Sequence, residues 1–103
     1  MPAGAYVAVM VIELHFPEAG SLKAKRRELS SIKAQLQGRL GAAVAETGHQ
    51  DLWQRATLTA ALTSGSAHRL SAAADELERW VIARCPEGAR VERLVASVED
   101  LRG

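Results

Sequence analysis

The alternation of apolar side chains over Tyr6–Phe16 constrains the fold of this chain more than any other feature. Every second residue from Tyr6 onward is apolar, so one face of this segment is wholly hydrophobic. The other face begins with valines and ends with Glu13 and His15. A period of two over this length predicts a long, well-buried β-strand, and Pro17 ends it because proline cannot donate to a strand ladder.

Further along the chain, periodicity predicts two helices and three more strands. Ser21 is a favourable N-cap for the first helix, whose apolar side chains recur on one stripe until Gly41. Alternation returns over Trp53–Thr63, where one face is apolar and the other is rich in threonine. The complete set of predicted elements is strand 6–16, helix 22–40, strand 42–46, strand 53–63, helix 67–85 and strand 90–98.

The resulting order, β-α-β-β-α-β, is typical of the ferredoxin-like split βαβ fold. This α+β architecture has a four-stranded antiparallel sheet in the order 4-1-3-2, with both helices on one face. A chain of 103 residues is long enough for one such domain and too short for two. We therefore expect residues 1–103 to form a single domain.

Composition indicates an ordinary globular protein in a reducing compartment. Nearly half of the residues are apolar, about a quarter are charged, and Cys85 has no second cysteine with which to form an internal disulfide. We expect Cys85 to be a small packed residue near a helix end. The apolar run near the start is far shorter than the roughly 20 residues of a membrane span. These features predict a cytoplasmic protein that does not associate with membranes.

The small net charge of +1 conceals a local excess of cations at the start of the first helix. Lys23, Lys25, Arg26 and Arg27 occupy the first two turns, where the helix dipole disfavours cations, and only Glu28 dilutes them. A phosphate partner would reverse this penalty, so these four residues are candidate RNA-binding residues. The alternative is that they are solvated side chains whose stems cover the apolar stripe.

The stretch AETGHQDLWQRATL, residues 45–58, holds the densest group of polar residues. Glu46, His49 and Asp51 could bind a metal or transfer protons, but no second motif supports that interpretation. The simpler interpretation is a hairpin joint in which Asp51 binds backbone N–H groups, Trp53 covers one end of the sheet and Arg55 pairs with Glu46. The exposed residues of a candidate recognition surface here are Gln50, Trp53 and Arg55.

Motifs that would indicate catalysis are missing from the sequence. It contains no nucleophile elbow, phosphate-binding glycine loop or paired metal-ligand spacing. Acylphosphatases share the predicted fold but resemble one another in using an asparagine to orient water, and this chain contains no asparagine. We therefore expect no enzymatic activity, no cofactor and no bound metal ion.

Two sequence blocks, Ile12–Leu36 and Val44–Leu58, resemble the YlxP-like family of small bacterial proteins, which is classed as a domain of unknown function. The resemblance covers roughly the first sixty residues. It implies a ferredoxin-like fold and, because genes of the family tend to lie among those for translation initiation and ribosome maturation factors, a role near RNA or the ribosome. Val11 departs from the family, in which a basic residue is common at this position.

The sheet face opposite the helices bears on how RNA could bind. It carries valines and threonines rather than the aromatic side chains on which RNA-recognition motifs stack bases. We expect this chain to be a non-catalytic module that binds structured or ribosomal RNA by charge and shape, with no DNA partner. The alternative is a protein-interaction or homodimerisation module that uses this open face. Residues expected on the face are Val7, Val9, Val11, Thr57, Thr59, Ala61 and Val95.

Overall fold

The computed structural model describes residues 4–103 and confirms the predicted order of elements. One short helix follows the last predicted strand. No helix in the described part of the chain is both long and apolar enough to cross a membrane. The elements are β1 (Tyr6–His15), α1 (Leu22–Gly38), β2 (Ala43–Gly48), β3 (Arg55–Ser64), α2 (Ala67–Arg84), β4 (Ala89–Ser97) and α3 (Val98–Arg102).

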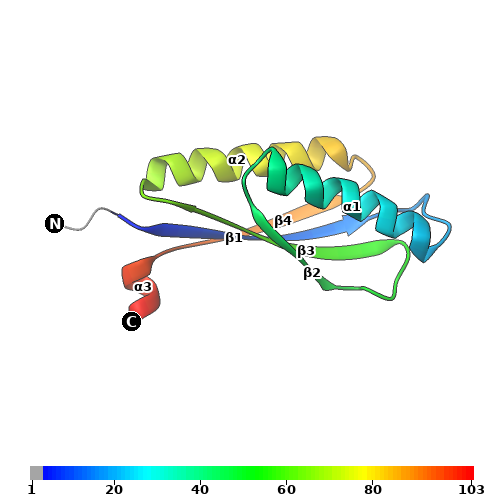
Figure 1. Ribbon diagram of the computed structural model, residues 1–103, viewed down its shortest axis with the longest axis horizontal. Helices are drawn as coiled ribbons and strands as arrows, with labels where there is room; N and C mark the ends of the chain where they lie inside the picture. The colour runs from blue at the N-terminus through cyan, green and yellow to red at the C-terminus, as the bar shows by residue number, and fades with distance from the viewer. Residues whose placement is uncertain (1–3) are drawn as a thin grey trace.

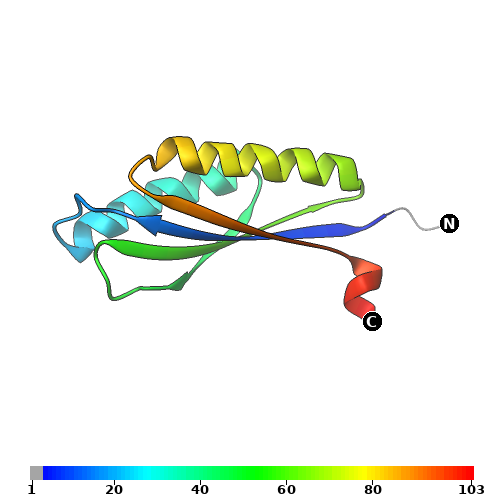
Figure 2. The same cartoon turned by 180° about the vertical axis from the view of Figure 1, so that it is seen from behind.

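The four strands form one antiparallel sheet in the order β2-β3-β1-β4, which is the predicted order. Helices α1 and α2 both lie on one face of this sheet (Figure 1). The ferredoxin-like α+β arrangement is therefore confirmed. The opposite face is left open along most of its length, and α3 projects on that side at the end of the sheet where β1 begins (Figures 1 and 2).

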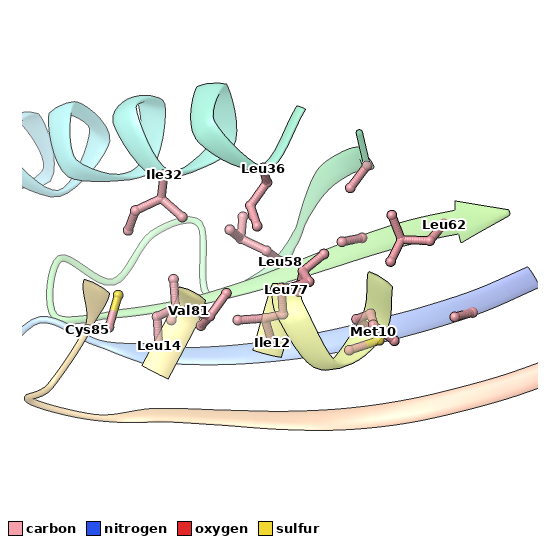
Figure 3. Packing of buried hydrophobic residues seen from close by; sticks show 14 of the residues in the cluster. Met10, Ile12, Leu14, Ile32, Leu36, Leu58, Leu62, Leu77, Val81 and Cys85 are labelled. Atoms are coloured by element: carbon pink, nitrogen blue, oxygen red, sulfur yellow. The ribbon is translucent and has the colours of Figure 1, made fainter. Parts of the chain in front are cut away.

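The hydrophobic core lies between the sheet and the two helices. The alternate residues of β1 that the sequence predicts to be buried, such as Met10 and Ile12, are fully buried. They meet Ile32 and Leu36 of α1 and Leu77 of α2 (Figure 3). Burial of apolar surface at about 25 cal/mol per Å² is the main term that holds the helices to the sheet.

Helix α1 begins as predicted and ends earlier than predicted. The Ser21 side chain accepts a hydrogen bond from the Ala24 N–H at 3.0 Å, which caps the helix start. The last helical residue is Gly38, a poor helix former, and Gly41 adopts a left-handed conformation with φ of 69°. Leu40, predicted as the last residue of the helical stripe, lies beyond the helix but still packs against the core.

Two boundaries at the other connections also differ from the predictions. Strand β3 begins at Arg55 rather than Trp53, because residues 49–54 form an irregular loop. Strand β4 ends at Ser97, and Ser97 then caps α3. The Ser97 hydroxyl accepts from the Asp100 N–H and the Asp100 carboxylate accepts from the Ser97 N–H, each at 3.0 Å. This reciprocal capping box is what starts the helix that the sequence analysis missed.

The strand register corrects one residue of the predicted open face. Val9 pairs with Leu94, so Leu94 shares the open face with the β1 valines. Val95 pairs with Ala8, whose side chain is in the core, and therefore lies on the helix side of the sheet. The assignment of Val95 to the open face was wrong because it placed β4 one residue out of register, which exchanges the two faces.

Candidate functional site

Lys25 points into the protein and does not extend from the basic surface. Its side chain is 1% exposed, and its ammonium donates to the backbone carbonyls of His49 at 2.7 Å and Arg55 at 3.0 Å. It also donates to the carbonyl of Leu52, while the carbonyl of Gln50 lies at 3.4 Å. The prediction of Lys25 as an RNA contact was wrong, because a cation already enclosed by protein oxygens cannot reach a phosphate.

Glu46 supplies the counter-charge for this buried cation. Its carboxylate Oε2 lies 3.7 Å from the Lys25 Nζ atom, and that oxygen is buried with no hydrogen-bond partner among the described residues. Strand pairing with Leu58 places Glu46 on the helix side of the sheet. The predicted Arg55–Glu46 pair was therefore wrong, since Lys25 occupies the position beside this carboxylate and the Arg55 side chain is exposed.

The loop at residues 49–54 has a backbone suited to surround an ammonium group. A register shift between Glu46 and Gly48 forms a bulge at the end of β2. His49 then adopts a left-handed conformation with φ of 59°, and its carbonyl also accepts the Leu52 N–H at 3.1 Å. Because several carbonyls of one loop converge on Lys25, this loop and the first turns of α1 are joined into one structural unit.

The candidate recognition residues Gln50, Trp53 and Arg55 all have exposed side chains. Trp53 is 49% exposed, so about half of its surface is available to a partner. The Asp51 carboxylate makes no hydrogen bond within residues 4–103, and the predicted bonds to the turn are therefore missing. The loop is bound instead by Lys25, which donates to its carbonyls rather than accepting from its N–H groups.

The three other candidate RNA-binding residues, Lys23, Arg26 and Arg27, have exposed side chains. None of them lies within ion-pair distance of a carboxylate in the described chain. The first turn of α1 contains no acidic residue. The cluster is therefore a set of unneutralised positive charges on the helix that carries Lys25.

A cavity of about 300 Å³ lies between the start of α1, the β1–α1 loop and the end of α2. Arg27 lines it, together with an ion pair in which Arg84 Nη2 lies 2.8 Å from Glu28 Oε2. Cys85 also lines it and is 7% exposed, which confirms its expected packed position. Burial raises the pKa of the Cys85 thiol, although the Arg84 cation opposes part of this shift. A thiol in this state is a poor nucleophile at neutral pH.

The histidines near this end of the molecule take part in structural contacts. His49 Nε2 lies 3.9 Å from the Glu13 carboxylate, which also accepts a 2.9 Å hydrogen bond from the Thr57 hydroxyl. The His15 backbone N–H binds the Gly88 carbonyl at 3.1 Å. No group of three potential metal ligands occurs within residues 4–103. These contacts favour the interpretation of the polar stretch as a hairpin joint.

The sequence contained a signal for the buried lysine. Lys25 precedes Leu29, Ile32 and Leu36 by 4, 7 and 11 positions, a spacing that places it on the apolar stripe of the helix. A lysine on such a stripe must either extend along the surface or find internal acceptors. The carbonyls that it finds come from a segment more than twenty residues away, so only the folded chain brings them together.

Comparisons with known proteins agree with this fold. The DUF503 family, described as a protein of unknown function, matches residues 7–98. The uncharacterized protein YlxP of Bacillus subtilis (strain 168) is 34% identical over 82 residues, which cover 80% of this chain and 85% of that protein. The de novo designed protein Foldit4 matches with a TM-score of 0.58 and 11% identity over 89% of this chain and 96% of its own, a likeness of fold alone. Since the family match spans nearly all of the described residues, this chain belongs to the DUF503 family, whose members are the YlxP-like proteins.

Proposed function

We propose that this chain is a non-catalytic accessory module that binds RNA through the outward cations of α1 and the adjacent loop at residues 49–54. The observation that carries the proposal is the Lys25 ammonium, which ties this loop to the basic start of α1. The two candidate surfaces, one cationic and one bearing an exposed tryptophan, thereby belong to one rigid end of the molecule.

Charge supports a phosphate partner. Lys23, Arg26 and Arg27 are exposed and have no carboxylate partner in the described chain, and they lie where the helix dipole makes neighbouring cations unfavourable. Each phosphate contact would relieve that repulsion and release counterions. The resemblance to YlxP-like proteins, with genes among those of translation factors, makes ribosomal RNA the first RNA to test.

The exposed tryptophan supports RNA with unpaired bases. Stacking of a base on an aromatic ring contributes about 1–3 kcal/mol and tolerates any base. Trp53 is exposed on a loop whose carbonyls are bound by the Lys25 ammonium. Because the loop is already ordered, little conformational entropy would be lost when Trp53 binds a base. Gln50 and Arg55 flank it with hydrogen-bonding groups. Unpaired segments of structured RNA combine the phosphates and bases that such a surface would contact.

Charge reversal on α1 tests the proposal. We expect Lys23→Glu with Arg27→Glu to abolish co-sedimentation with ribosomes and binding to a ribosomal RNA hairpin, while circular dichroism remains that of the wild type. Lys33→Glu with Arg39→Glu is the matched control, since it makes the same change in charge farther along the same segment. Single alanine changes at Lys23, Arg26 or Arg27 should each reduce the salt slope of binding by about one unit.

The fluorescence of Trp53 tests the loop independently. In a Trp80→Phe variant, Trp53 is the remaining tryptophan, and we expect its emission to be quenched by a hairpin with an unpaired loop more than by a fully paired duplex. Equal binding by the two charge-reversed variants, or unchanged Trp53 emission at saturating RNA, would contradict the proposal.

A further inference from the structure

Strand β4 forms one edge of the sheet, so one side of its backbone faces away from β1 (Figure 2). Hydrogen bonds at its two ends show which residues face outward. The His15 N–H donates to the Gly88 carbonyl at 3.1 Å, and the Val98 N–H donates to the Ala5 carbonyl at 2.8 Å. Since backbone groups alternate in direction along an antiparallel strand, the even-numbered residues of β4 bond to β1 and the odd-numbered residues point outward.

The outward backbone groups of β4 are open to a further strand. The N–H groups of Val91, Arg93 and Val95 have no partner within residues 4–103. Ser97 agrees with the alternation, because its N–H binds the Asp100 carboxylate rather than β1. Neither a register shift nor a proline interrupts β4. An unpaired edge of this kind is a template for the backbone of another β-strand.

Exposed apolar side chains gather around this edge. Leu94 and Val95 are 51% and 57% exposed and lie on opposite faces of β4. Ile82 of α2, also exposed, lines a shallow hollow together with Arg93. Leu101 is exposed on α3, which follows β4 directly. Apart from the loop at residues 49–54, these side chains are the large apolar ones that residues 4–103 expose, so the β4 edge differs from the rest of that surface.

We infer that β4 of a second copy pairs antiparallel with this edge and joins the two sheets into one. A two-fold axis beside Arg93, the middle residue of β4, uses the whole strand and places Val91 opposite Val95 of the second copy. Cross-strand pairs of β-branched residues are favourable, and both valines lie on the helix side of the sheet. The outward N–H and C=O groups of the two strands then satisfy one another.

The other edge of the sheet fits this pairing less well. Strand β2 has six residues, and its pairing with β3 shifts register between Glu46 and Gly48. A bulge of this kind bends the strand and interrupts its edge. Pairing of β4 with β2 would also repeat from copy to copy, whereas pairing of β4 with itself closes after two copies. The uninterrupted edge that this chain offers to β4 is therefore β4 of a second copy.

Charges along the β4 edge balance, which allows two copies to approach. The Arg93 guanidinium lies 2.8 Å from Asp75 and 3.3 Å from Glu78. Because α2 of the same copy already neutralises Arg93, the two-fold axis does not bring two free cations together. The charged residues on or beside the edge are three cations and three anions, namely Arg79, Arg90, Arg93, Asp75, Glu78 and Glu92.

Further charged residues lie just beyond the two ends of β4. Glu87 precedes the strand, and α3 follows it. Within α3, Glu99 pairs with Arg102 at 2.9 Å, and the Asp100 carboxylate accepts the Ser97 N–H. These acids of α3 already have partners, so we expect the backbone and apolar contacts of the strand to set the association and high salt to weaken it little.

Amide hydrogen exchange at increasing protein concentration tests the direction of these backbone groups. As the dimer forms between micromolar and millimolar concentration, exchange at Val91, Arg93 and Val95 should slow in proportion to the fraction of monomer that remains. The amides of Glu92 and Leu94, which bond to β1 in both states, should not change. Sedimentation equilibrium of the same samples measures the dimer fraction.

Substitutions at Val95 separate strand pairing from other contacts. Val95→Pro removes an outward N–H but no bond to β1, and edge strands accept proline at such positions. This variant should keep the wild-type circular dichroism spectrum and lose the dimer. Val95→Lys is a second variant with the same expected result, since an edge lysine opposes strand addition. Val95→Thr retains the N–H and the β-branched shape, so it is the control and should dimerise like the wild type.

Three results would overturn the inference: a monomeric wild type at millimolar concentration, a dimer that persists in both Val95→Pro and Val95→Lys, or a dimer in which the odd-numbered amides stay unprotected. Val9→Lys charges the open sheet face and should leave the dimer intact. Its loss in that variant would assign the contact to the open face instead. These measurements need no RNA, so their outcome is independent of the proposed RNA binding.

Discussion

The two ends of the sheet hold their peripheral segments in opposite ways. At one end, the loop at residues 49–54 has almost no regular hydrogen bonding of its own, and a buried ammonium from α1 binds its carbonyls. At the other end, α3 is started by contacts between Ser97 and Asp100, three residues apart on the surface. The hydrogen bonds that hold the loop are long-range and buried, whereas those that start α3 are local and exposed.

This difference shows which peripheral segment is coupled to the stability of the whole domain. A cation removed from water must keep its acceptors, so Lys25 couples the loop to the folding of the whole domain. A surface capping box stabilises the few residues around it, and α3 has no buried residues. The loop is therefore expected to open only when the domain unfolds, whereas α3 can fray while the rest remains folded.

The largest expected effect comes from Lys25→Met, which keeps the bulk of the side chain and removes the charge. The carbonyls of His49 and Arg55 would lose their donor, and the buried Oε2 atom of Glu46 would lose its counter-charge. We expect the free energy of unfolding to fall by about 3–5 kcal/mol. Urea denaturation measures this loss, and hydrogen exchange should increase throughout the loop.

Asp51→Ala is the control for this prediction in the same loop. Because the Asp51 carboxylate binds nothing within residues 4–103, its removal should change the free energy of unfolding by less than about 0.5 kcal/mol. Similar losses in the two variants would mean that Lys25 does not anchor the loop and would remove the contrast between the two ends.

A smaller effect is expected for Glu46→Gln, which retains the shape of the side chain but removes the counter-charge 3.7 Å from the Lys25 ammonium. Since the carbonyls of the loop remain in place, we expect a loss of about 1–2 kcal/mol, between the values for exposed and buried ion pairs. Thermal or urea unfolding would measure it. A loss as large as that of Lys25→Met would assign the anchoring to the ion pair rather than to the carbonyls.

The smallest effect is expected at α3 on acidification. Hydrogen bonds from the Ser97 backbone and hydroxyl hold the pKa of Asp100 below its ordinary value. A carboxyl whose pKa is lowered by folding stabilises the folded form above its ordinary pKa, and this contribution is lost as the pH falls through the folded value. Secondary Cα chemical shifts of α3 should therefore report fraying at acidic pH, while the hydrogen-exchange protection factors of the loop stay unchanged. Simultaneous changes at both ends would contradict local fraying.

The sequence by itself determined the fold class, because periodicity and strand order depend on local patterns. The alternation over residues 6–16 predicts both faces of β1, and the helical stripes predict which side chains enter the core. The capping box of α3 was also readable, since Ser97 and Asp100 stand at the spacing that such boxes require, yet the strand pattern led to its omission. The exposed cations Lys23, Arg26 and Arg27 were likewise identified from their positions along the helix.

Tertiary structure alone decided that the Lys25 ammonium is enclosed by carbonyls and on which face of the sheet Val95 lies. Helical spacing places Lys25 on the apolar stripe, but the side chain becomes buried only because the backbone of a distant loop supplies its acceptors. Every residue has a backbone carbonyl, so residue types do not indicate which carbonyls will accept hydrogen bonds from a buried lysine. The register of β4 also depends on contacts between distant segments. A shift of one residue exchanges the two faces of the strand, and only pairing with β1 selects between them.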